Sequence, residues 1–188
     1  MPTAAGLSSS TFSTSMSVHP LVRLAADAIQ AFLIERRTLG PPESLFAAVP
    51  EALRPGGVFV CLKLEGQLRG CIGSVEPIQP SLALEIIHNA IGAATRDSRF
   101  PPVQTWETEL LQITVDVLGL SEPVEGPASL DPRTFGVIIK AGPRQGVLLP
   151  DIEGVTSAIE QVAIAREKAG VGHDEPIELF RFTATRYR

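Results

Sequence analysis

The sequence predicts an α+β fold in which strands and helices follow one another in two similar series. Short apolar runs rich in β-branched residues, typical of strands, flank stretches in which apolar residues recur every three or four positions, typical of helices. The order strand, strand, helix, strand occurs twice along the chain. Two such β-β-α-β-like repeats would share a mixed or antiparallel sheet, with an N-terminal helix before them and room for a groove where they meet.

The N-terminal helix is expected from Leu21 to about Arg37. Pro20 suits the start of a helix, and apolar side chains follow it at helical spacing. The segment 40–42, Gly-Pro-Pro, ends this helix. A short helix or turn is expected next, over residues 43–53.

The first repeat is expected to open with a β-hairpin. Val58–Leu64 is apolar and rich in β-branched residues, the pair 65–66, Glu-Gly, supplies a tight turn, and Gln67–Val75 returns as the partner strand. A helical stripe with Ser81 as its N-cap follows. Apolar and polar residues then alternate over residues 111–117, as expected for a strand with one buried face.

The second repeat shows the same order with different residues. Residues 135–140 and 146–150 predict a second hairpin, residues 156–168 predict a second helix, and the alternating residues 180–184 predict a closing strand.

The chain divides into a tail and one domain. Residues 1–18 are rich in Ser and Thr and are expected to form a flexible tail, and the domain occupies residues 19–188. Within the domain, the first repeat spans about residues 56–120 and the second about residues 134–188. The acidic, Pro- and Gly-rich stretch 119–133 is expected to link them.

Composition narrows the classes of function. The net charge is −5 and the Lys and Arg residues form no cluster, which argues against a nucleic-acid partner. No stretch is apolar for long enough to span a membrane, and the tail lacks the basic and apolar segments of a secretory signal. The two Cys and three His residues show no spacing typical of metal ligands, so no metal or cofactor is predicted. The low cysteine count favours a reducing cytoplasm.

The predicted hairpin contains the segment QLRGCIGS, which holds one of the two cysteines. With a two-residue turn and a regular ladder, Val60 would pair with Cys71, so that Arg69 and Cys71 share one face of the hairpin, roughly 6.6 Å apart. A neighbouring guanidinium lowers the pKa of a thiol and raises its thiolate fraction. The same register places Cys61 opposite Gly70 and predicts no disulfide between the two cysteines.

The role of this thiol has two interpretations at the level of the sequence. Cys71 is either a nucleophile or ligand with Arg69 as its electrostatic partner, or a buried structural cysteine beside a bulge, with Arg69 paired to a carboxylate. Gly70 and Gly73 weaken a strand, so they indicate a bulge or the close approach of another backbone or of a ligand.

A second candidate cluster, RDSRFPP, lies at the end of the first-repeat helix. Arg96, Asp97 and Arg99 could present one carboxylate and two guanidiniums to a polar or anionic ligand, since Arg binds such groups in a bidentate manner. An internal salt-bridge network that fixes the helix end is the alternative.

The segment LRGCIG at residues 68–73 resembles the signature of the AMMECR-type domain family, which occurs in archaea, bacteria and animals. The resemblance continues through the block 97–102 and through Glu109-Leu110, and it reaches the C-terminus with weaker matches that include the Lys-Ala-Gly of residues 168–170. One departure lies in residues 151–167, where family members commonly carry a Gly-Trp segment and this chain has no Trp.

This resemblance implies a larger and a smaller lobe with a cleft near the signature strand. The residues expected to act on a substrate are Cys71 and Arg69, and those expected to bind it are Gly70, Gly73, Asp97, Arg99 and Glu109. Because prokaryotic members are often encoded beside a Memo-like metalloprotein and a radical SAM enzyme, the resemblance also implies a shared pathway and a partner of that kind. The expected function is a cytoplasmic enzyme or enzyme component that handles a small polar or anionic ligand. The alternative is a noncatalytic binding or adaptor domain.

Overall fold

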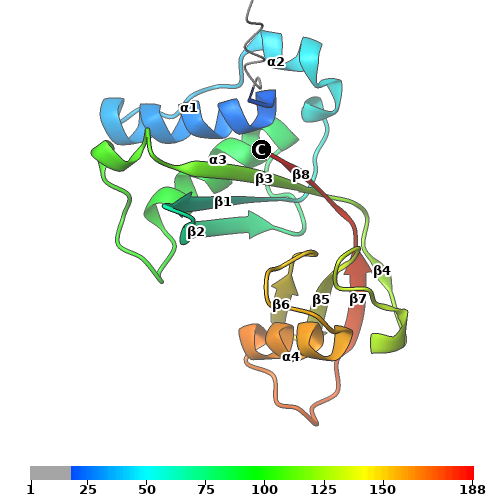
Figure 1. The fold of residues 1–188 in the computed structure, drawn as a ribbon. Helices are drawn as coiled ribbons and strands as arrows, with labels where there is room; N and C mark the ends of the chain where they lie inside the picture. Colours follow the sequence, from blue (N-terminus) through cyan, green and yellow to red (C-terminus); the bar gives the residue numbers. More distant parts are fainter. Residues whose placement is uncertain (1–17) are drawn as a thin grey trace, which may run out of the picture.

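The computed structural model describes residues 18–188, so the tail expected over residues 1–18 lies outside the described residues except for Val18. The described chain forms two lobes, which Figure 1 shows one above the other. The larger lobe contains α1 (Pro20–Glu35), α2 (Glu43–Ala48), β1 (Val58–Leu64), β2 (Gln67–Ser74), α3 (Leu82–Thr95), β3 (Gln112–Leu118) and β8 (Ala184–Tyr187). The smaller lobe contains β4 (Glu122–Pro123), β5 (Gly136–Ala141), β6 (Arg144–Leu148), α4 (Ala158–Ala169) and β7 (Glu178–Phe182). Three short 3-10 helices are η1 (Pro50–Leu53), η2 (Thr105–Glu107) and η3 (Pro127–Ser129).

Each lobe is built on one four-stranded antiparallel sheet. Sheet A, in the larger lobe, has the strand order β2-β1-β3-β8, and sheet B, in the smaller lobe, has the order β4-β7-β5-β6. The α+β class is therefore confirmed, as is the order β-β-α-β in each half. The expectation that both repeats share one sheet is wrong in that detail, because no ladder among the described strands joins sheet A to sheet B.

Local sequence signals set the ends of the helices. Pro20 occupies the first turn of α1, the His19 side chain caps that turn, and Arg36 ends the helix in a left-handed conformation with φ of 56°. At the start of α3, Ser81 Oγ accepts a hydrogen bond from the Leu84 N–H at 3.3 Å, which confirms the predicted N-cap.

The core of the larger lobe lies between sheet A and the helices α1 and α3. Alternate residues of β1 point toward these helices, and Val58, Val60 and Leu62 are fully buried among them. Phe59 and Cys61 point the other way and contact the smaller lobe. One face of sheet A is thus covered by helices, and the opposite face is turned toward sheet B.

A small apolar cluster joins the two lobes. Ile138, Leu149 and Phe182 of the smaller lobe are buried, and Phe59 and Leu118 of sheet A pack against them. Burial of this surface holds the lobes together by the hydrophobic effect. The part of sheet A that this cluster leaves uncovered is the floor of the cleft described below.

The two repeats exchange their last strands. After β3 the chain crosses into the smaller lobe, where β4 pairs with β7, and after β7 it returns to the larger lobe, where β8 pairs with β3. Both crossings connect the two lobes in Figure 1. The closing strand predicted over residues 180–184 is therefore two strands, one in each sheet, and the stretch 119–133 holds β4 and η3 in addition to its role as a connection.

An equivalent hydrogen bond from a helix side chain to the backbone near a strand occurs in both repeats. In α3, Asn89 Nδ2 donates to the carbonyl oxygen of Val58 at 3.1 Å, and in α4, Gln161 Nε2 donates to the carbonyl oxygen of Phe135 at 2.7 Å. Val58 is the first residue of β1, and Phe135 directly precedes β5. The helix of each repeat is thus fastened to the same place on its own sheet.

Candidate functional site

The signature strand, β2, carries a β-bulge at Arg69. The first two pairs after the hairpin turn follow the predicted register, but Leu62 then faces Gly70 rather than Arg69. One extra residue on a strand turns every later side chain to the opposite face. Cys71 consequently faces Cys61, and the predicted register is wrong beyond the bulge.

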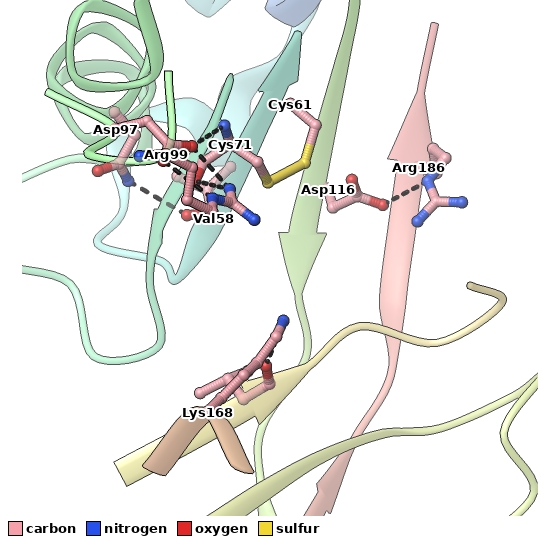
Figure 2. The surroundings of a disulfide bond; sticks show 10 residues. Val58, Cys61, Cys71, Asp97, Arg99, Asp116, Lys168 and Arg186 are labelled. Carbon is pink, nitrogen blue, oxygen red and sulfur yellow. Dashed lines mark hydrogen bonds and ion pairs between the residues drawn. A yellow bond between two sulfur atoms is a disulfide. The ribbon is translucent and has the colours of Figure 1, made fainter. Parts of the chain in front are cut away.

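Cys61 and Cys71 are joined by a disulfide, so the expectation that they would not pair is wrong (Figure 2). The N–H and C=O groups of Cys71 point to the outer edge of sheet A, where Asp97 and Arg99 bind them. The two cysteines therefore form a non-hydrogen-bonded pair, the kind in which facing side chains lie closest, and their Cα atoms are 4.1 Å apart. Because Cys71 is not a free thiol in this structure, a nucleophilic role for it requires prior reduction.

Asp97 and Arg99 contact the backbone of Cys71 and not its sulfur. Asp97 Oδ2 accepts from the Cys71 N–H at 2.8 Å, and Arg99 Nη2 donates to the Cys71 carbonyl at 3.4 Å. Arg99 also pairs with Asp97 at 2.6 Å, and its hydrogen bonds are the main reason why the pKa of the Asp97 carboxyl is lowered to about 2. The pair thus occupies the open edge of β2 where another strand would otherwise bond.

Arg69 turns away from the disulfide and binds the loop that precedes β3. Its Nε and Nη2 donate to the two carboxylate oxygens of Glu107 at 2.8 and 2.9 Å, and its Nη1 donates to the carbonyl of Pro101 at 2.8 Å. These hydrogen bonds lower the pKa of Glu107, whose side chain is buried. The hydrogen bonds of the Arg69 side chain thus go to this loop and not to Cys71. Glu109 is exposed, and no side-chain hydrogen bond or ion pair of it occurs among the described residues.

At Gly70 and Gly73 other parts of the protein come so close that there is no room for a side chain. A Cβ at Gly70 would overlap the carbonyl oxygen of Ala93 in α3, and a Cβ at Gly73 would overlap the ring of Phe59. The prediction of a bulge or a close backbone approach is confirmed for Gly70. Since Gly70 faces α3, it lies on the side of sheet A that is opposite the cleft.

Most of the signature therefore forms an internal network that fixes β2 to α3 and to the 97–107 loop. This arrangement agrees with the structural interpretations offered from the sequence: a cysteine beside a bulge, an arginine paired to a carboxylate and a salt-bridge network at a helix end. The residues that line open space are a different set.

A cleft of about 680 Å³ lies between the uncovered face of sheet A and the loop 149–153 of the smaller lobe. Its size falls within the range of about 300–1,000 Å³ typical of small-molecule sites. The residues that line this interlobe cleft are Cys61, Lys63, Leu68, Gln112, Ile113, Thr114, Asp116, Leu149, Asp151, Ile152, Glu153, Arg186 and Arg188. The signature strand contributes Leu68 directly and Cys71 through its disulfide partner Cys61.

Asp116 and Arg186 form an ion pair that lines the interlobe cleft. Neither residue was predicted from the sequence to belong to a site. They face each other across β3 and β8, and Arg186 Nε donates to Asp116 Oδ1 at 2.7 Å. Asp116 is only 1% exposed, and burial raises the pKa of its carboxyl, although the charges of Arg186 and Arg188 oppose that rise. The two residues are 70 positions apart in the chain, and the strand exchange alone brings them together.

Lys168, near the C-terminal end of α4, was also missed as a site residue. Figure 2 shows its side chain pointing from the smaller lobe toward the disulfide, and its Nζ donates to the Val147 carbonyl at 3.3 Å. Partial burial and then the positive charge of Arg99 lower the pKa of the Lys168 ammonium. The one sequence signal for it was the Lys-Ala-Gly match to the family at residues 168–170.

No group of three or more His, Cys, Asp or Glu side chains in residues 18–188 is placed to hold a metal ion. Within the same residues, each helix is too short or too polar to cross a membrane.

Comparison with known proteins gives consistent matches along the chain. The family model AMMECR1 matches residues 22–187. A Thermotoga maritima protein is 47% identical over 174 residues, which cover 90% of this chain and 98% of that protein. A Clostridium acetobutylicum protein is 39% identical, and the match covers 90% of this chain but 36% of that longer protein. Among solved structures, the uncharacterised protein PH0010 from Pyrococcus horikoshii matches with a TM-score of 0.81 and 35% identity, over 88% of both chains.

Proposed function

The chain belongs to the AMMECR1 family, and on that premise we propose that it is a cytoplasmic enzyme or enzyme component that handles a small polar or anionic substrate in the interlobe cleft. The observation that carries the proposal is the cleft itself, a space of ligand size between two lobes that is floored by charged side chains of sheet A. Sites of this kind combine an apolar lining with a few convergent polar groups.

The chemistry of the cleft lining favours a polar ligand. Lys63, Arg186 and Arg188 supply positive charge, while Asp116, Asp151 and Glu153 supply negative charge. Leu68, Ile113 and Ile152 add apolar surface between them. A small molecule with both a charged group and hydrogen-bonding groups fits such a lining better than an apolar molecule or a long anionic polymer.

The disulfide sets a condition on any covalent role of Cys71. Two-electron reduction by a dithiol would break the Cys61–Cys71 bond, oxidise the dithiol to a disulfide and leave two protein thiols. Figure 2 shows the Lys168 side chain directed toward the disulfide, and a cation near a thiol stabilises the thiolate form. In cytoplasmic proteins disulfides are usually transient, which is consistent with a site that works in the reduced form.

The second candidate function is a noncatalytic binding or adaptor domain. It is favoured by one specific observation: Arg69, Asp97 and Arg99, which a catalytic signature would direct at a substrate, all bind the protein itself. The longer Clostridium relative carries chain beyond the matched part, as a domain that works with a partner would. A Memo-like or radical SAM protein is the partner class that we propose.

A metabolite-profiling experiment separates these possibilities. The full chain is incubated, with and without dithiothreitol, in a mixture of small polar metabolites, and mass spectrometry records which compounds are consumed and which are retained. We expect at least one compound to be consumed, and Thr114→Trp, which fills the floor of the interlobe cleft, to abolish this. Leu53→Trp, at an exposed position outside the cleft, is the matched control.

Each outcome of that experiment has a distinct meaning. A compound that is retained unchanged supports the binding domain over the enzyme. If no compound is consumed or retained, the small-molecule proposal is overturned, and co-purification with Memo-like and radical SAM proteins becomes the test of the adaptor.

A further inference from the structure

One oxygen of Asp116 has no hydrogen-bond partner within the described structure. Asp116 Oδ1 accepts from Arg186, but Oδ2 is buried and unpartnered. A buried polar atom without a partner costs about 1–3 kcal/mol, so proteins seldom leave one without a reason. Asp116 also lines both the interlobe cleft and a smaller space beside it, so this one residue borders both spaces.

The smaller space, the side pocket, is rich in guanidinium groups. It has a volume of about 280 Å³, and its lining is Asp116, Arg133, Thr134, Pro150, Asp151, Ala184, Arg186 and Arg188. Among the described residues neither Arg133 nor Arg188 forms an ion pair, and Arg186 uses only its Nε on Asp116. Three guanidiniums therefore face two carboxylates, and the remaining N–H groups suit a carboxylate or phosphate.

We propose that the side pocket binds the anionic group of a small ligand while Asp116 Oδ2 accepts a hydrogen bond from a hydroxyl or amine on the same molecule. The inference rests on the proposed function and narrows its substrate class to compounds in which an anion stands next to a hydrogen-bond donor. Arg133 and Arg186 come from opposite lobes of the fold, since Arg133 precedes β5 and Arg186 lies on β8. A ligand at this place therefore contacts both lobes.

In the proposed site Arg186 binds the anion of the ligand and Asp116 selects for a hydrogen-bond donor on it. Arg186 holds one carboxylate oxygen in place and keeps its Nη groups for the ligand anion. Asp116 discriminates between ligands, because a buried acceptor left unpaired penalises a molecule that lacks the donor. We therefore expect selection by Asp116 between a hydroxylated compound and its deoxy analogue.

The test uses matched probes on the full chain, followed by chemical-shift titration in NMR. Lactate is compared with propionate, and glycerol 3-phosphate with propyl phosphate, so that each pair differs by hydroxyl groups and the two pairs distinguish a carboxylate from a phosphate. Glycerol is the probe without an anion. We expect the hydroxylated member of one pair to bind about 10- to 100-fold more tightly than its analogue, as expected for a hydrogen bond to a charged group.

Two variants assign the effect to the proposed groups. Asp116→Asn should remove the preference for the hydroxylated probe, and Arg133→Ala should weaken both anionic members of the pair about equally. The matched controls, Asp174→Asn and Arg23→Ala, are exposed residues away from both spaces and should bind as the parent does. Asp116→Asn takes one charge out of the pair with Arg186, which can lower stability. Thermal unfolding therefore checks the fold, and binding is measured at temperatures where every variant is folded.

Failure of this inference can be told apart from failure of the proposed function. A preference that persists in Asp116→Asn, or no binding of any probe, overturns the inference. The proposed function stands in either case if a metabolite is still consumed in a manner that Thr114→Trp abolishes.

Discussion

Arg69 and Glu107 form a bidentate ion pair across 38 positions of the chain, with both carboxylate oxygens within 2.9 Å of the guanidinium. Both side chains are largely withdrawn from solvent, at 14% and 5% exposure. The pair and the bonds of Arg69 to Pro101 and Pro102 tie the bulge of the signature strand to the loop before β3. Arg69 therefore stabilises the fold, and its substitution should lower the free energy of unfolding.

Arg69→Ala is expected to lower the free energy of unfolding by roughly 3–5 kcal/mol, because it leaves the buried Glu107 carboxylate without its partner. Arg69→Lys should lose less, since it keeps the charge but not the bidentate geometry. Urea denaturation measures both. The exposed pair of Arg37 and Glu35 supplies the control, and Arg37→Ala should change stability by about 0–1 kcal/mol. Equal losses at Arg69 and Arg37 would contradict this account.

Gly70→Ala is expected to destabilise the larger lobe, because the added Cβ would come closer than 3.0 Å to the backbone of Ala93. Gly146→Ala should do the same in the smaller lobe, where the obstacle is the backbone of Ala165 in α4. Gly40→Ala meets nothing within 4 Å and is the control. Thermal unfolding of the three variants checks the prediction, and a Gly70 variant as stable as the Gly40 variant would refute the close approach.

The disulfide predicts that neither cysteine is alkylated by iodoacetamide until a reductant is added. Reduction should lower the free energy of unfolding by about 2–3 kcal/mol, the chain-entropy value for a loop of this size. In a Cys61→Ala background, the pH dependence of Cys71 alkylation then reports the pKa of the thiol. A pKa near the free value of about 8.5 would exclude an activated nucleophile. Labelling of the untreated protein would show that the bond is absent in solution.

Stability should fall in acid as Asp97 becomes protonated. The pKa of this carboxyl is about 2 in the folded protein against an ordinary value of 3.8, so its contribution is complete above pH 3.8 and is lost as the pH falls toward 2. Because Arg99 is half exposed, we expect a loss of roughly 1–2 kcal/mol. Asp97→Asn should remove this part of the pH dependence. If Asp97→Asn loses as much stability as the parent between pH 3.8 and pH 2, other carboxyl groups cause the loss.

The sequence predicted the elements of this fold better than their pairing. Helical and strand periodicity depends on neighbouring residues, so the helix capped by Ser81 and the hairpin were found where expected. Register depends on a single residue: the bulge at Arg69 moved Cys71 from opposite Val60 to opposite Cys61. Gly70 and Gly73 indicated an irregularity, but nothing in the sequence said at which residue the ladder would slip.

The candidate site was predicted only in part, for a related reason. Asp97 and Arg99 do come together with Cys71, but they bind its backbone, whereas Arg69 binds the buried Glu107. Spacing along the chain cannot reveal either arrangement. Asp116 was one polar residue of an alternating strand. It became a site residue only because β8, from the far end of the chain, lies beside β3.

The exchanged strands carry a consequence for how such a molecule is assembled. Each half lends its last strand to the other, so a chain cut between residues 125 and 130 would yield two fragments that each lack an edge strand and own a surplus one. Neither fragment has a complete sheet by itself, and each carries the piece that the other needs. A single repeat made twice would meet the same need by pairing with its own copy, as a symmetric dimer with swapped arms. The single chain described here has the arrangement of such a dimer within one polypeptide, and its cleft lies where the interface between the two copies would be.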